Sequence, residues 1–261
     1  MAMGIATIQA IVPTLSGYLN VYYSWHVIFY FSLMVALVAL WAIYRYLPVA
    51  SIPTNILSKT GTVKATFKIY SNTLISPRFF YFTLANTFIS GAFFTFVINV
   101  PFIVTDILSG NSLDYGNWYL AVALGFWLGC FIASQISERV GNDKMMRLGW
   151  GIGILAGIIM FVCIFVYGVS YWSLFTTMTL FTFGRGLSLP NVQVAAATAT
   201  PYGRSTAMGL FSFCQLLFGA AIAQLSTTFV KQNIILLPII ITLLTIFALM
   251  SYFKAIKFNT D

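Results

Sequence analysis

The residues best suited to bind a ligand interrupt a long apolar run, FTFGRGLSLPNVQ, that covers residues 181–193. Arg185 offers a fixed fork of N–H donors, and the amides of Asn191 and Gln193 offer both donors and acceptors. This group predicts hydrogen bonds to a bound molecule. The alternative interpretation is a structural arginine, which bridges helix ends or extends its side chain along the helix to water.

A second set of residues combines aromatic rings with amides. Large rings provide contact area for apolar ligands, and a few amides fix the ligand's orientation. The members of this set are Asn86, Phe93, Phe94, Asn99 and Gln215. Together with Arg185 they are the candidate substrate-cavity residues. The alternative for the rings is contact with lipid, and for Gln215 it is a hydrogen bond between helices.

The remaining reactive side chains are scattered along the sequence. The five acidic residues and the single histidine, His26, form no cluster. The three cysteines, Cys130, Cys163 and Cys214, lack C-x-x-C spacing. A membrane-embedded enzyme would need grouped acids, histidines or metal ligands. We therefore expect no metal, no cofactor, no disulfide and no enzymatic activity.

Composition identifies the elements that must position these residues. The chain is 60% hydrophobic and only 7% charged, whereas soluble domains carry about 25% charged residues. Long apolar segments without the short alternation of barrel strands indicate an all-α integral membrane protein. The expected spans cover residues 3–20, 26–47, 79–105, 115–136, 147–168, 171–198, 205–229 and 232–253. The span at 171–198 is long and interrupted, and thirteen residues separate Trp172 from Arg185, which predicts a depth two-thirds of the way to the cytoplasm.

Basic residues predict the orientation, because positively charged loops stay on the cytoplasmic side. The polar linker at 48–78 is basic, without any acid, and is expected to be cytoplasmic together with the C-terminus. Of the thirteen Lys and Arg residues, this topology places all but Lys231 and Arg185 inside. The net charge of +8 then reflects orientation and anionic lipid, so we expect no nucleic-acid partner. The predicted location is the inner (plasma) membrane.

The N-terminal stretch GIATIQAIVPTLSGYLNVYYSWHVIFYF, residues 4–31, resembles the fifth helix and the start of the sixth helix of major facilitator drug antiporters. Pro13 and Gly17 match the antiporter helix motif, and Trp25 matches the turn that follows. Val12, Ser16 and His26 depart from the pattern.

Three further stretches resemble the same superfamily. SQISERVGNDK is similar to the loop between the second and third helices of each half, with Glu138, Arg139 and Gly141 matching its motif. Residues 99–125 and 186–220 resemble the bicyclomycin-resistance (Bcr/CflA) branch. The resemblance implies a drug/proton antiporter that exports small hydrophobic compounds. Glu138 and Arg139 would pair in one conformation, or else form a solvated turn.

The resemblance also predicts the domain organisation. Residues 1–47 correspond to the last two helices of an N-terminal bundle, 48–78 to the linker and 79–261 to a complete six-helix C-terminal bundle. The first four helices of a twelve-helix carrier would be absent. The expected partners are therefore a hydrophobic substrate, protons, the bilayer and a chain that supplies those helices. The alternative function is a remnant or accessory subunit that does not transport alone.

Proton coupling normally needs a carboxylate inside the membrane. The resemblance places an acidic residue near Asp106, at the outer end of the third span. The alternative is an interfacial carboxylate without a coupling role. If the family's proton site lies in the absent helices, this polypeptide does not couple by itself.

Overall fold

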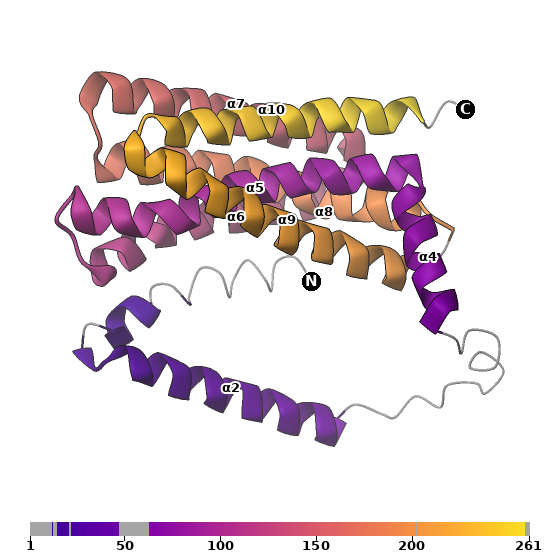
Figure 1. Ribbon diagram of the computed structural model, residues 1–261, viewed down its shortest axis with the longest axis horizontal. Helices are drawn as coiled ribbons and strands as arrows, with labels where there is room; N and C mark the ends of the chain where they lie inside the picture. The colour runs from indigo at the N-terminus through magenta and orange to yellow at the C-terminus, as the bar shows by residue number, and fades with distance from the viewer. Residues whose placement is uncertain (1–11, 13–14, 21, 47–62, 202, 259–261) are drawn as a thin grey trace.

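The computed structural model describes residues 12, 15–20, 22–46, 63–201 and 203–258. Every regular element in those residues is a helix (Figure 1). The helices are α2 (Trp25–Tyr46), α4 (Val63–Ile75), α5 (Pro77–Asp106), α6 (Ser112–Val140), α7 (Asn142–Tyr167), α8 (Thr177–Thr198), α9 (Arg204–Gln232) and α10 (Leu236–Lys257). A five-residue π-helix, η1 (Trp172–Thr176), leads into α8.

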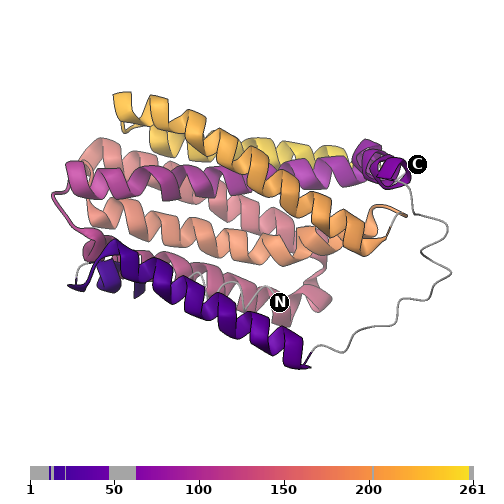
Figure 2. The same ribbon diagram turned by 60° about the horizontal axis from the view of Figure 1, so that its bottom comes forward.

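The predicted spans agree with these helices wherever the structure describes them. Among the described residues, six helices are long and apolar enough to cross a membrane: α2, α5, α6, α7, α9 and α10. The polar side chains of α8 keep it out of that set, although it runs through the bundle beside the others (Figure 2). The glycines and the proline that interrupt the apolar run of 171–198 do not break the helix, because α8 continues through Pro190; the irregular part of this span is the π-helix η1. The first predicted span lies largely outside the described residues. The all-helical membrane fold is confirmed.

Part of the basic linker is helical, which the sequence did not lead us to expect. Its second half forms α4, which contacts α5 and α9 and lies crosswise at one end of the bundle (Figures 1 and 2). Phe67 and Lys68 are exposed on it, while Thr73 is buried. The mixture of Lys, Ser, Thr and Asn hides the helical signal, because contacts with the bundle stabilise α4 more than its own propensity does.

Two sets of helices build the core. In one, α8 packs against both α6 and α7; in the other, α5 packs against both α9 and α10. Contacts between α10 and α7 and between α5 and α8 join the two sets. Large buried side chains fill the space between them, such as Trp150 of α7 and Tyr252 of α10, whose ring centroids are 5.0 Å apart. Large apolar side chains also cover the outer surface, as expected of a protein surrounded by lipid.

Basic residues gather at one end of the bundle. Arg78 begins α5, Arg139 and Arg147 flank the α6–α7 turn, and Arg204 begins α9. Lys254 is in the last turn of α10, at the same end (Figure 1). The opposite end carries an acidic capping box, in which the Asn111 side chain accepts N–H bonds at the start of α6 and Asp114 accepts from the Asn111 backbone.

The helix α2 is separated from the main bundle (Figure 1). None of its residues is buried, although its sequence is as apolar as that of the core helices. Residues 15–20, just before it, are helical and reach the start of α6. There the Asn20 side chain donates to Ser112 Oγ at 3.1 Å.

Candidate functional site

Arg185 lies in the interior of the bundle, where its guanidinium is enclosed by aromatic rings. The side chain is only 3% exposed. Its Cζ atom lies 4.4 Å from the ring centroid of Phe93 on α5 and 5.1 Å from that of Phe126 on α6. Both contacts are within the range of cation–π attraction, which strengthens when the cation is desolvated. Sequence analysis identified Phe93 and missed Phe126.

Glycines on both sides of Arg185 determine the direction of its side chain. A Cβ atom on Gly184 would collide with the backbone of Gly149 on α7, and one on Gly186 would collide with the carbonyl oxygen of Phe126 on α6. Successive helical residues point about 100° apart. With its neighbours turned towards α7 and α6, Arg185 projects between them and reaches α5. All six residues from 184 to 189 are buried, so α8 is enclosed at this level.

The guanidinium lies near the midpoints of the helices that surround it. Arg185 is thirteen residues after Trp172 and thirteen before Thr198, so it bisects the η1–α8 segment. Phe126 is likewise midway along α6, and Phe93 is close to the midpoint of α5. The predicted depth of two-thirds compared the same thirteen residues with a hydrocarbon layer of about 30 Å, whereas η1 and α8 together are longer than that layer.

No acidic residue in the described part of the chain neutralises Arg185. The described acids all lie at helix ends, where Asp106, Glu138 and Asp143 are exposed and Asp114 is half-buried, and none of them forms an ion pair with another described residue. The Nε and Nη1 atoms of Arg185 are buried without a hydrogen-bond partner in the described part of the chain. Such a group is costly: a mid-membrane arginine costs at least about 2.5–3.5 kcal/mol.

Two side chains of α6 lie close to this charge. Tyr119 and Cys130 both interact electrostatically with Arg185, and both are buried. The Tyr119 phenol is a hydrogen-bond donor and acceptor beside a desolvated cation. Neither residue was identified from sequence, because a single tyrosine or cysteine in an apolar helix does not differ from core packing. The glycines were the available sequence signal for close packing of α6 against α8. A Cβ atom on Gly129 of α6 would lie 2.9 Å from the Cα atom of Gly186 on α8.

A polar stripe runs along α5 towards Phe93. Thr83, Asn86 and Ser90 are all buried, and their Oγ1, Oδ1 and Oγ atoms respectively have no hydrogen-bond partner among the described residues. Their spacing of three and four residues places them on one face of the helix. Asn86 Nδ2 donates to Gln215 Oε1 of α9 at 2.8 Å. This pair brings two predicted site residues together and leaves one amide oxygen available.

The other predicted cavity residues are distributed differently. The amide of Asn99 donates to Thr95 O at 2.7 Å and to Ser226 Oγ at 3.3 Å, so it joins α5 to α9. Phe94 is half-buried beside Gly219 of α9.

On α8, the structure separates the predicted amides from Arg185. Asn191 is buried but donates to Leu187 O at 2.7 Å within its own helix. It follows Pro190, which removes a backbone donor from the helix. Gln193 is half-buried and forms no hydrogen bond with Arg185. The three residues do not form one polar group.

Asp106 is exposed and accepts a hydrogen bond from Thr105 Oγ1 at 2.9 Å. With Lys231 and residues of α5 and α9 it lines a hollow of about 240 Å³ at the end of the bundle opposite the basic residues. The Lys231 Nζ atom lies over the Phe102 ring, 5.4 Å from its centroid. This geometry agrees with an interfacial carboxylate.

The residues that matched the family loops are placed as follows. Glu138 and Arg139 are exposed at the end of α6, and no ion pair joins them in the described structure. Gly141 has φ 91°, a conformation that favours glycine and permits the sharp turn into α7. Gly17 is buried, and a Cβ there would lie 2.8 Å from Ser112 O, so the helix before α2 approaches α6 closely. Pro13 lies outside the described residues.

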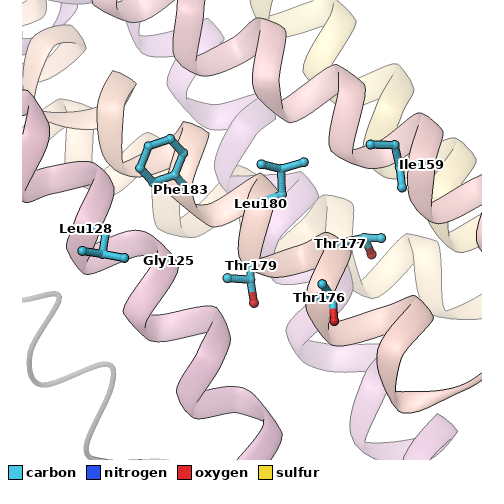
Figure 3. Close-up of a pocket in the computed structure, with 8 residues that line it drawn as sticks. All are labelled: Gly125, Leu128, Ile159, Thr176, Thr177, Thr179, Leu180 and Phe183. Carbon is cyan, nitrogen blue, oxygen red and sulfur yellow. The ribbon is translucent and has the colours of Figure 1, made fainter.

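A separate hollow of about 500 Å³ opens between α6, α7 and the η1–α8 segment (Figure 3). Its lining residues are Gly125, Leu128, Ile159, Thr176, Thr177, Thr179, Leu180 and Phe183. None of them is titratable, and none is among the aromatic neighbours of Arg185. This hollow therefore suits an apolar chain rather than a ligand with polar groups.

Comparison with known proteins assigns the family. The family model described as Major Facilitator Superfamily matches residues 1–224 of the chain. The search of curated proteins found no match to the chain. The match spans α2 and most of the helical bundle, including Arg185 and its aromatic neighbours. The chain belongs to the Major Facilitator Superfamily of multi-pass membrane transport proteins.

Proposed function

We propose that this chain exports small hydrophobic compounds in exchange for protons, as a drug antiporter of the Bcr/CflA type. The observation that carries the proposal is the buried cluster of Arg185, Phe93 and Phe126 at mid-depth in the bundle. Two rings provide apolar contact area, and two guanidinium nitrogens are without partners. A ligand site of this kind is mostly apolar with a few converging polar groups.

Each residue of the site has a distinct proposed role. Phe93 and Phe126 contact the apolar body of the compound, and Arg185 donates hydrogen bonds to one polar group on it. Asn86, held by Gln215 at 2.8 Å, extends the polar wall along α5. Asn191 maintains α8 near Pro190 and does not contact the compound.

The proposed orientation places the basic end of the bundle, the linker and the C-terminus in the cytoplasm of a cell whose inner membrane holds the protein. Asp106 then faces the outer side. The carboxylate of Asp106 is exposed, which supports an interfacial role. We therefore propose that proton exchange does not depend on Asp106.

The proposal is tested by drug export. Cells lacking their own exporters, loaded with a neutral fluorescent dye, should lose the dye faster when they express this chain, and a protonophore should abolish the difference. Arg185→Ala should keep its membrane level and reduce export at least about tenfold, the equivalent of one charge-assisted hydrogen bond. Lys231→Ala, which also removes a cation above a ring, is the matched control and should export normally. Equal export by Arg185→Ala and the parent chain would contradict the role of Arg185.

A second candidate is an accessory membrane subunit that transports only with helices from another chain. The observation in its favour is α2, a 22-residue apolar helix with no buried residue. An apolar helix surface that is not packed in its own fold is available to a partner helix. Cysteine crosslinking from Phe29 or Leu37, both exposed on α2, should capture another membrane protein in native membranes. Absence of any crosslinked partner, together with dye export by the purified chain in liposomes, would reject this candidate.

A further inference from the structure

The buried positive charge of Arg185 determines which chemical groups a bound compound can place beside it. Arg185 is a full positive charge that no described acid offsets, and its Nε and Nη1 atoms are sealed without a partner. The aromatic faces of Phe93 and Phe126 attract it at 4.4 and 5.1 Å but accept no conventional hydrogen bond. The donors on Nε and Nη1 therefore remain unused.

A desolvated guanidinium favours one class of ligand group over the others. Carboxylate, sulfonate and phosphate oxygens match its fork in pairs, and hydrogen bonds to charged groups are the strong ones. A neutral carbonyl gains less, and an ammonium group would be repelled by a like charge with little water to screen it. The buried phenol of Tyr119 interacts electrostatically with the same guanidinium.

From this geometry we propose that Arg185 is an anion-recognition site, and that the preferred substrates are aromatic or apolar compounds carrying one anionic oxygen group. The apolar body lies against Phe93 and Phe126. The anionic group contacts Arg185 once the Phe93 ring rotates away from it. This inference rests on the proposed export function, of which it specifies the substrate class.

The position of the site excludes a lipid headgroup as the intended anion. Arg185 lies midway along the η1–α8 segment, thirteen residues, or about 20 Å of helix rise, from each end. Headgroup phosphates lie at the ends of the spanning helices, about 15 Å from the middle of a 30 Å hydrocarbon layer. The anion must therefore belong to a molecule that enters the bundle.

Binding of three matched probes tests the inference. The purified full chain in phosphatidylcholine nanodiscs is incubated with radiolabelled 2-naphthoate, 2-naphthamide or 2-naphthylmethylammonium, which share a ring system and differ in charge. We expect naphthoate to bind at least about tenfold more tightly than the other two. Arg185→Gln should bind all three probes alike. Arg185→Lys keeps the charge and should retain part of the preference, and Lys231→Gln should retain all of it.

Several results would overturn the proposal: equal binding of the three probes to the parent chain, no naphthoate binding above that of protein-free nanodiscs, or an intact preference in Arg185→Gln. Thermal unfolding of each variant verifies that it is folded, and Arg185→Lys provides a second variant if Arg185→Gln is not. Adding phosphatidylglycerol to the nanodiscs should leave naphthoate binding unchanged; competition by it would assign the site to lipid and contradict the inference.

Dye export distinguishes this inference from the function on which it rests. If cells export the neutral dye but the purified chain shows no preference for naphthoate, anion recognition fails and the export function stands. If naphthoate is preferred but neither dye nor naphthoate is exported, the export function fails and the anion site stands.

Discussion

Replacement of Arg185 by methionine should make the protein more stable while it impairs ligand binding. Methionine keeps a long, flexible apolar chain beside Phe93 and Phe126. It removes a mid-membrane charge that costs at least about 2.5–3.5 kcal/mol. It also removes two cation–π contacts, at 4.4 and 5.1 Å, which together contribute about 2 kcal/mol because the two rings share one desolvated cation. The expected net change is about 1 kcal/mol in favour of Arg185→Met.

The assay is thermal unfolding of the purified proteins in the same nanodiscs. For a chain of this size, 1 kcal/mol corresponds to about 2–4 °C in the melting temperature. We expect Arg185→Met to melt at a higher temperature than the parent chain and to lose the preference for naphthoate. If the arginine instead completed a buried ion pair or bridged helix ends, its removal would cost about 3–5 kcal/mol. A fall in the melting temperature of more than about 5 °C would therefore refute the reasoning.

Three further substitutions test the surroundings of the site. Gly186→Val should lower the free energy of unfolding by at least about 1–3 kcal/mol, because the valine side chain would meet the α6 backbone. The control Gly151→Val should melt near the parent temperature, because nothing lies within 4 Å of a Cβ atom there. Similar losses of stability in both variants would contradict close packing of α6 against α8. Gln215→Leu should lower the free energy of unfolding by about 0.6 kcal/mol or more and weaken dye export, because Asn86 Nδ2 loses the acceptor that it contacts at 2.8 Å. An unchanged melting temperature and unchanged export would mean that the hydrogen bond between Asn86 and Gln215 has no role. Asp106→Asn should leave dye export and its sensitivity to a protonophore intact, because the carboxylate is exposed; loss of protonophore sensitivity would assign proton coupling to Asp106.

Sequence reasoning located the spanning helices well because apolar length is a strong signal that packing does not alter. The predicted spans at 79–105 and 232–253 differ from α5 (Pro77–Asp106) and α10 (Leu236–Lys257) by only a few residues. Conversely, α4 was missed because its polar composition carries little helical periodicity.

The candidate site was predicted only in part. The burial of Arg185 followed from an arginine flanked by glycines within an apolar run, and Phe93 followed from its aromatic context on α5. Phe126 was missed, because only its tertiary contact with Arg185 of α8 distinguishes it from the other apolar residues of α6. Tyr119 was missed because its electrostatic interaction with Arg185 leaves no signal in the sequence. The hydrogen bond from Asn191 to Leu187 O could not be predicted, because sequence proximity to Arg185 does not reveal which hydrogen bonds an amide makes within its own helix.

The most direct test of the account is dye export by the intact chain. Cells without their own exporters are loaded with a neutral hydrophobic dye, and its release is followed with and without a protonophore, after the protein has been detected in the membrane. The account predicts faster release than in cells without the protein, and loss of that difference when the proton gradient is removed. Release no faster than in the control cells, with the chain present and folded in the membrane, would contradict it.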